Sequence, residues 1–418
     1  MNLTDKLRRF LPQETVPQQR RPAAADLDPY LRGKEINTPH GPCYVVEREF
    51  PLTNRHGPAS LGQVAQDPYD SLCHLEPKFQ NEFRIENALF IDTETTGLAG
   101  GTGTYAFLVG LGYFTPGGFM CRQLLMRDYN EEHALLYLLG KELDKKRTLV
   151  TFNGKSFDLP LLQTRFTLAR LPSAGFFGPA HLDLLHISRR LWRRKLESCS
   201  LNSLEANILG IDRIDDLPGY LIPQRYFDFL HTGNGGLLED IARHNLTDIL
   251  SMPVLLWQLH SVCKARPGAC ACPWEGEALA ALALARSEQN LALAYLRAAQ
   301  GLCCEAEQHV RILKAQAAIY KRQEDYKQAG RLWFEVLKTF SADLHCLEEL
   351  AKYYEHRAKD LPAALEMTNR GLAAAVRTKS SQAGAWQHRL RRLQRKMGAA
   401  REEIKGRGGK ILKEGLPN

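Results

Sequence analysis

Two acidic residues follow an apolar run near residue 90, in the stretch ALFIDTETTGL. Asp92 and Glu94 are two positions apart, and alternate residues of a strand point to one face of a sheet, so both carboxylates point the same way. Because ALFI is expected to be buried, the pair lies at the edge of a core. Two carboxylates held close repel each other unless a proton or a cation neutralises them. The pair therefore predicts a site for Mg²⁺ or Mn²⁺, which prefer oxygen ligands, and a solvated strand end is the alternative.

Two further carboxylates occupy comparable positions. Asp158, in FNGKSFDLP, falls in the first turn of a helix that follows a strand, and Ser156 is expected to cap that helix. Asp248, in HNLTDIL, is four residues after His244, and residues four apart are neighbours on one helical face. Each motif alone is common on protein surfaces. Together, and in this order, they predict an acidic site at the edge of a sheet.

The elements that must position these residues alternate between strands and helices. Strand patterns occur in ALFID, TYAFLVGLGYF and FMCRQLLM, and a further strand, TLVTFNG, follows the helical pattern EEHALLYLLGKELDKK. Three adjacent strands followed by strand–helix alternation predict an α/β fold, with a mixed sheet flanked by helices. AHLDLLHI is one more candidate strand. His181 and Asp183 within it are either supporting residues of the cleft or polar groups at the sheet edge.

The composition divides the chain into five parts. Residues 1–40 are rich in Pro, Gln, Arg and Ala and predict a flexible lead, and residues 41–86 predict a strand-containing annex. The α/β domain covers residues 87–265. The sequence then shifts to Ala, Leu, Gln and charged residues, which predicts an all-α region of helical repeats over residues 275–400 and a basic tail over residues 401–418.

The helical region contains an approximate internal repeat. AAIYKRQEDYKQAGRLWFEVL and AKYYEHRAKDLPAALEMTNRGL align at a period of about 34 residues, so that Tyr320 matches Tyr354 and Ala329 matches Ala363 or Ala364. This period is typical of tetratricopeptide repeats, whose paired helices stack into a solenoid with a concave surface for a protein partner. An ordinary helical bundle is the alternative.

Length, composition and charge restrict the class of protein. At 418 residues the chain is too long for one ordinary core, so two or three domains are expected. Hydrophobic residues make up 44% of the chain, and its net charge is +8. No stretch approaches the roughly 18 consecutive apolar residues of a membrane span, and the N-terminus lacks the pattern of an export signal. These observations predict a cytoplasmic protein. RRLWRRK, at residues 189–195, packs five cations into seven residues, which suits a polyphosphate partner or else forms a solvated helix face.

The cysteine pattern offers a weaker signal. Cys263, Cys270 and Cys272, with Cys303 and Cys304 downstream, could supply thiolates to zinc. The pairs separated by two residues that are usual in zinc sites are absent. Free thiols are therefore the favoured interpretation.

The three acidic motifs resemble a known superfamily. FIDTETTGL, FNGKSFDLP and HNLTDIL are similar to the three motifs of the DEDD exonucleases, whose catalytic domain has a ribonuclease H-like fold. SLNSLEANILG resembles the helix that such domains carry between the second and third motifs. The chain resembles the bacterial YprB-like group of ribonuclease H-like proteins, some of which carry tetratricopeptide repeats. The resemblance covers about residues 87–260 and, more loosely, the C-terminal repeats.

The resemblance implies a site for two divalent ions, Mg²⁺ or Mn²⁺. Asp92, Glu94 and Asp248 would coordinate one ion, and Asp92, with Asp158 acting through water, would hold the second. Two such ions, about 4 Å apart, activate a water and stabilise the leaving oxygen in phosphodiester hydrolysis. The superfamily's general base is a His five residues before the last Asp, or a Tyr four residues before it. His244 stands at the tyrosine spacing, so it is either the base or a residue that supports the metal site.

The resemblance also implies substrate contacts. Thr95, Thr96, Gly97 and Leu98 would lie against the terminal nucleotide, and Asn153 would orient the substrate or cap the strand end. GLAGGTGTYAF lacks the Gly-Lys-Ser/Thr ending of a phosphate-binding P-loop. The predicted function is a 3′–5′ exonuclease on single-stranded RNA or DNA. The alternative is an inactive nucleic-acid-binding adaptor that uses its helical repeats for protein interaction.

Overall fold

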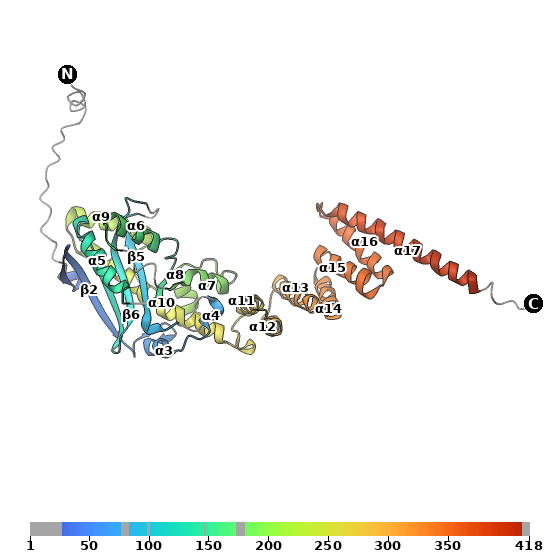
Figure 1. Ribbon diagram of the computed structural model, residues 1–418, viewed down its shortest axis with the longest axis horizontal. Helices are drawn as coiled ribbons and strands as arrows, with labels where there is room; N and C mark the ends of the chain where they lie inside the picture. Colours follow the sequence, from blue (N-terminus) through green and yellow to red (C-terminus); the bar gives the residue numbers. More distant parts are fainter. Residues whose placement is uncertain (1–26, 77–82, 98–100, 146–147, 173–179, 412–418) are drawn as a thin grey trace, which may run out of the picture. The chain divides into compact units, whose positions relative to one another are not determined.

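The computed structural model forms two units, Met1–Ser261 and Val262–Asn418, and each is described here by itself. The structure describes residues 27–76, 83–97, 101–145, 148–172 and 180–411 (Figure 1). The side chains of residues 28 and 400–411 are outside this description. No helix among the described residues is long and apolar enough to cross a membrane.

The first unit is built on a seven-stranded mixed sheet with the order β1-β2-β7-β6-β5-β8-β9 (Figure 1). In that order the strands are Lys34–Thr38, Gly41–Pro51, Gly118–Leu125, Ala106–Phe114, Ala88–Thr95, Thr148–Thr151 and Ala180–Asp183. In this sheet order, β1, β2, β7, β6 and β5 each pair antiparallel with the next strand, whereas β5 and β8, and β8 and β9, pair parallel. The predicted mixed sheet is confirmed. Residues 41–51 form β2 within this sheet, since residues 41–45 pair with β1 and residues 44–51 pair with β7.

Helices flank the sheet. The α-helices of this unit are α2 Asp28–Leu31, α3 Leu61–Gln66, α4 Leu72–Leu75, α5 Glu132–Leu143, α6 Asp158–Leu168, α7 Leu184–Trp192, α8 Leu201–Leu204, α9 Ile222–Thr232 and α10 Gly236–Lys264. Apolar side chains of α5, α6 and α9 form one core with those of the central strands. Phe107 of β6 stacks on Tyr226 of α9 with ring centroids 3.8 Å apart, and the Tyr226 hydroxyl donates to the Met126 carbonyl.

Two glycines of β6 allow α10 to approach the sheet closely. A Cβ atom at Gly110 would lie 2.2 Å from Oδ1 of Asn245, and one at Gly112 would lie 2.7 Å from Cγ2 of Ile249. A side chain at either position would force the neighbouring side chains of α10 to shift. These glycines therefore bring the HNLTDIL segment of α10 against β6, one strand away from β5.

The structure differs from three of the local predictions. Ser156 does not cap α6, because its amide donates to the Asn153 carbonyl within a turn and the helix begins after Phe157 without a side-chain cap. AHLDLLHI is half strand and half helix, since β9 ends at Asp183 and α7 follows. SLNSLEANILG forms the short helix α8 and then a π-helical turn, Glu205–Leu209.

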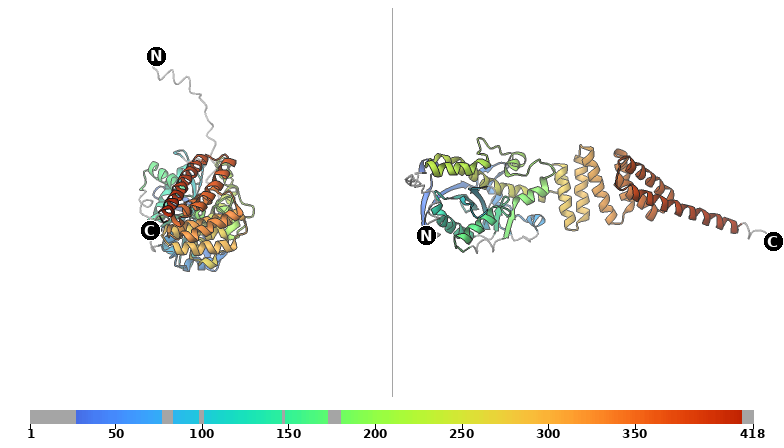
Figure 2. Two further views of the ribbon diagram at one scale, coloured as in Figure 1. Left: turned by 90° about the vertical axis from the view of Figure 1, so that its right-hand side faces the viewer. Right: turned by 90° about the horizontal axis from the view of Figure 1, so that it is seen from above.

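The second unit is helical throughout its described part. Its α-helices are α11 Pro273–Ala285, α12 Gln289–Leu302, α13 Ala306–Arg322, α14 Tyr326–Thr339, α15 Leu344–Tyr353, α16 Leu361–Arg377 and α17 Ala383–Ile411. Consecutive helices pack against each other as pairs, and Figure 2 shows them side by side. The predicted helical C-terminal region is confirmed, whereas its assignment to tetratricopeptide repeats stays a prediction.

Candidate active site

Strand β5 carries the first two carboxylates. Asp92 is half-buried and Glu94 is buried, and the Asn245 side-chain amide of α10 donates to Oδ2 of Asp92 at 2.8 Å. Burial, together with the negative charges of Asp248 and Asp158, raises the pKa of Asp92 well above its ordinary value. Burial and the charge of Asp92 raise the pKa of Glu94 in the same way. The structure therefore brings the predicted carboxylates into one electrostatically coupled group.

Asp158 reaches this group from the first turn of α6. Its side chain is buried, and the hydroxyl of Thr93, which lies between Asp92 and Glu94 on β5, donates to its Oδ1 at 2.5 Å. Burial raises the pKa of Asp158 to about 6, although the Thr93 hydrogen bond opposes the shift. The parallel pairing of β5 with β8 explains this position, because α6 begins shortly after β8 ends at the same edge of the sheet.

Asp248 and His244 reach the group from α10, one helical turn apart. Nε2 of His244 lies 3.7 Å from Oδ2 of Asp248, and its Nδ1 lies 2.8 Å from Oδ1 of Asp216. Burial raises the pKa of Asp248 against the opposing charges of Arg213 and His244. Burial acts on Asp216 too, but its bonds to His244 and Arg213 hold the pKa of that carboxyl below its usual range.

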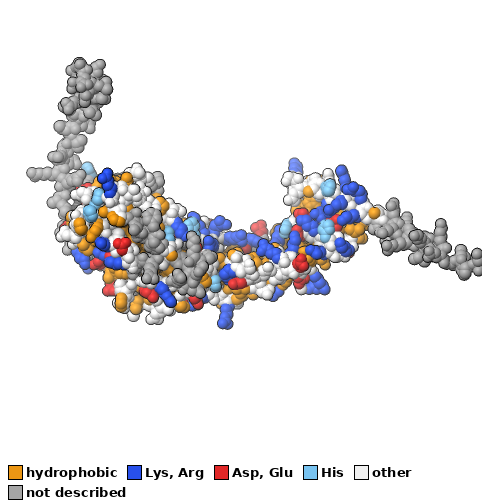
Figure 3. All heavy atoms as spheres, in the orientation of Figure 1, with side chains coloured by type: hydrophobic (Ala, Val, Ile, Leu, Met, Phe, Trp, Pro, Cys, Tyr) orange, Lys and Arg blue, Asp and Glu red, His pale blue; other side chains and the backbone are white. Residues whose placement is uncertain are grey.

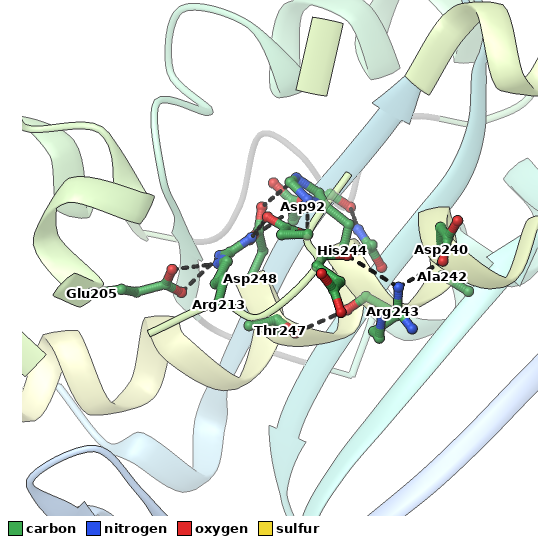
Figure 4. Close-up of polar contacts among 12 residues, drawn as sticks. Asp92, Glu205, Arg213, Asp240, Ala242, Arg243, His244, Thr247 and Asp248 are labelled. Carbon is green, nitrogen blue, oxygen red and sulfur yellow. Dashed lines mark hydrogen bonds and ion pairs between the residues drawn. The ribbon is translucent and has the colours of Figure 1, made fainter. Parts of the chain in front are cut away.

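Arg213 links these residues, although the sequence had not indicated it as a residue of the site. Its guanidinium bonds both oxygens of Glu205, at 2.5 and 2.7 Å, and also contacts Asp248 (Figure 4). It bonds Asp216 as well, at 3.0 Å. Glu205, in the π-helical turn, is fully buried. Arg213 and Asp216 also line an open cavity of about 470 Å³. Arg213 lies in a segment without regular secondary structure, so no spacing rule indicated its position; its only signal was a cation among acidic residues in IDRIDDLPG.

The predicted substrate-contacting residues lie at the end of β5 and after β8. The Thr95 hydroxyl donates to the Gly97 carbonyl at 2.9 Å, and Oγ1 of Thr96 accepts from the Tyr105 amide at 2.9 Å. These bonds shape the turn that follows Glu94. Leu98 lies outside the described residues.

Asn153 has a left-handed backbone, with φ of 66°. Its amide donates to Oδ1 of Asp183 at 2.9 Å, and the Lys155 amide donates to the other oxygen at 3.0 Å. Asp183 also caps α7 through the Leu185 amide. Asp183 is therefore a supporting residue of the turn that precedes Asp158, which is one of the two roles expected for it. His181 bonds the Thr151 hydroxyl at 2.8 Å.

The donor chemistry of the carboxylate group fits a divalent cation. All four residues offer oxygen ligands, and burial raises the pKa of each, with repulsion from the other carboxylates adding to the shift at Asp92 and Glu94; a cation would counter both effects. Among the described residues, however, no three His, Cys, Asp or Glu side chains are already arranged around a common metal position. Arg213 engages one oxygen of Asp248, so complete coordination requires these side chains to rearrange.

The cysteine cluster has different properties. All ten cysteines of the sequence have free thiols. Burial raises the pKa of Cys263 to about 12 and that of Cys270 to about 11. Burial therefore favours the neutral form of both thiols in this structure.

The mixed sheet and its acidic edge define a ribonuclease H-like domain, and a family model described as RNase_H superfamily matches residues 89–259. The chain is 33% identical over 363 residues to a protein of Bacillus subtilis (strain 168), the uncharacterized protein YprB. That similarity covers 85% of this chain and 86% of YprB. The chain belongs to the YprB family.

One solved structure shows a more distant likeness. It is the family B DNA polymerase from the hyperthermophilic archaeon Pyrobaculum calidifontis, with 13% sequence identity and a TM-score of 0.33. The match covers 56% of this chain and 29% of the polymerase chain, so the chain spans less than a third of that enzyme.

Proposed function

We propose that this protein is a metal-dependent nuclease of the DEDD type, a 3′–5′ exonuclease on single-stranded RNA or DNA in the cytoplasm. The observation that carries the proposal is the group of four buried or half-buried carboxylates contributed by β5, α6 and α10, in which Asp92 and Glu94 are repelled by the other acidic groups. Such a group costs a fold stability, whereas a phosphodiester-cleaving site needs carboxylates to hold cations. The RNase H superfamily match over the same residues supports this interpretation.

In this proposal Asp92, Glu94 and Asp248 would hold one Mg²⁺ or Mn²⁺ ion, and Asp92, with Asp158 acting through water, would hold a second. When bound, two such ions supply an activated water and stabilise the leaving oxygen. Asn245 fixes the orientation of Asp92 through its hydrogen bond. Thr93 does the same for Asp158.

His244 is the candidate general base. Its Nδ1 faces the Asp216 carboxylate, which favours the tautomer with the proton on Nδ1. Nε2, which lies on the side of Asp248, is then the basic nitrogen that accepts a proton. Thr95, Thr96, Gly97, Leu98 and Asn153 remain candidates for contact with the substrate.

The test is hydrolysis of single-stranded RNA and DNA, labelled at either end, by the full chain in Mg²⁺, Mn²⁺ or EDTA. We expect metal-dependent shortening from the 3′ end. Asp228→Asn, an exposed substitution on α9, is the matched control for Asp92→Asn and should retain activity. Full activity in EDTA would contradict the metal assignment, and cleavage only at internal positions would contradict the exonuclease assignment.

The contact between Arg213 and Asp248 favours a second candidate. Because a cationic side chain already engages one of the carboxylates, the domain could hold nucleic acid without cutting it. Such an inactive adaptor would bind single strands in every metal and shorten none of them. The hydrolysis test separates the two functions.

A further inference from the structure

The second unit carries a groove made by its own helices. Two adjoining cavities of about 450 and 370 Å³ lie along α13, α14, α15 and the π-helical turn Tyr354–Ala358, and they share part of their lining. We call their combined surface the basic groove. Its charged and tyrosine lining is Lys321, Arg322, Tyr326, Glu349, Lys352, Tyr353 and Arg357.

The groove surface is positively charged. Four Lys and Arg side chains line it against one carboxylate, that of Glu349. Glu349 is buried and bonds both Lys321 and Lys352, the latter at 3.1 Å. Its negative charge is therefore neutralised within the groove wall, and Arg322 and Arg357 give the surface an excess of positive charge.

Aromatic rings lie between these cations. Tyr326 and Tyr353 are half-buried, so each keeps part of its surface accessible. The Arg357 guanidinium lies 4.3 Å from the centroid of the Tyr326 ring and also donates to its hydroxyl at 2.8 Å. These contacts hold the tyrosine in place beside a cation. Proteins that bind single-stranded nucleic acids use this combination, because cations contact the phosphates and bases stack on the rings.

The net charge of the chain also differs between the two units, and the second unit is the positive one. Residues 262–418 contain 27 Lys and Arg against 17 Asp and Glu, a net charge of +10. Residues 1–261 contain 28 against 30, a net charge of −2, and the two values sum to +8. Figure 3 shows Lys and Arg side chains gathered on the displayed face of the second unit. The unit with the carboxylate site therefore has no net positive charge, although it contains the cationic segment of residues 189–195.

We propose that the basic groove binds single-stranded nucleic acid and captures the substrate of the carboxylate site. The inference rests on the proposed function for the identity of the substrate. An acidic peptide would satisfy the cations of the groove but would leave its tyrosines without a stacking partner. The positive net charge of the second unit also favours a polyanion, which this unit would bind and the first unit would cleave.

The experiment is fluorescence anisotropy of a labelled single-stranded oligonucleotide with the full chain in EDTA, so that binding is measured without cleavage. Arg322→Ala/Arg357→Ala removes two groove cations. Arg331→Ala/Lys338→Ala removes two exposed cations of α14 that do not line the groove. We expect the groove variant to raise Kd about tenfold or more and the control to change it less than about twofold.

Tyr326 tests stacking separately from charge. Tyr326→Phe retains the ring and should bind as the wild type does, whereas Tyr326→Leu should raise Kd about tenfold. Equal effects of the groove and control double variants would overturn the proposal. The proposal would also be overturned if the protein bound an oligoglutamate peptide and had no measurable affinity for the oligonucleotide. Failure of cleavage in Mg²⁺ and Mn²⁺ with groove-dependent binding intact would instead refute the nuclease and leave the groove assignment standing.

Discussion

Asp158 shows most clearly how the site affects stability at the scale of a single residue. Its folded-state pKa is raised from 3.8 to about 6, so the folded protein keeps a proton that the unfolded chain releases. Stability from this group is therefore present below about pH 3.8 and is lost as pH rises to about 6. In EDTA, Asp158→Asn should become more stable than the wild type by about 3 kcal/mol over this range. Urea denaturation between pH 4 and 8 measures the difference, and a pH-independent difference would contradict the assignment.

Arg213 stabilises the folded protein, whereas the ionised carboxylate of Asp158 destabilises it, because the charge of Arg213 neutralises a buried carboxylate. Arg213→Ala leaves Glu205 buried without its two guanidinium bonds, which should cost about 3–5 kcal/mol of folding free energy. Arg243→Ala is the control, since Arg243 is exposed and its pair with Asp240 lies at the surface, and it should change stability by about 0.5 kcal/mol or less. Thermal and urea unfolding measure both variants. Equal stability of the two variants would show that the Arg213 network is not structural.

At the scale of elements, the glycines of β6 determine how close α10 lies to the sheet. Gly110→Ala places a Cβ against the Asn245 side chain, which also holds Asp92, so it should destabilise the protein by about 1–3 kcal/mol and lower cleavage. Gly103→Ala is the control, because nothing lies within 4 Å of the Cβ position at Gly103. Unchanged stability of Gly110→Ala would contradict the proposed close approach.

Three of the carboxylate positions could be predicted because each depended on a local period, and Asp158 could be predicted from the helix start that follows a strand. Asp92 and Glu94 follow the two-residue period of a strand, and Asp248 follows the four-residue spacing of a helix. Arg213 could not be predicted in this way, since its contacts join an irregular segment to α10 and to the π-helical turn. The Ser156 cap was wrong because Asn153 adopts a left-handed turn that delays the start of α6.

The strand pairing shows a second limit of sequence analysis. Residues 41–51 had a clear strand pattern, but the pattern does not say which strand is the neighbour, and β2 pairs with β7 across about 75 residues of sequence. The glycines of TYAFLVGLGYF likewise marked no special role until α10 was placed against them. Both features depend on contacts between segments distant in the chain.

At the scale of the whole molecule, the two units should respond differently to metal. Mg²⁺ or Mn²⁺ would relieve repulsion only in the unit with the carboxylate group, adding about 2.7 kcal/mol at roughly 100 times the dissociation constant. Calorimetry of the full chain should show a metal-dependent rise in the unfolding temperature of that unit alone. Asp92→Asn/Asp248→Asn should abolish the rise. An equal rise in the double variant would mean that the metal binds elsewhere.

The central claim is that the carboxylate group of β5, α6 and α10 cuts nucleic acid with the help of divalent metal. The most direct test is the initial rate of hydrolysis of 3′-end-labelled single strands in Mn²⁺ by the wild type and by Asp92→Asn, with circular dichroism confirming that both are folded. We predict that the wild type releases labelled nucleotides and that Asp92→Asn loses activity more than about 100-fold. Equal rates for the two proteins, or no hydrolysis by the wild type in any metal, would contradict the claim.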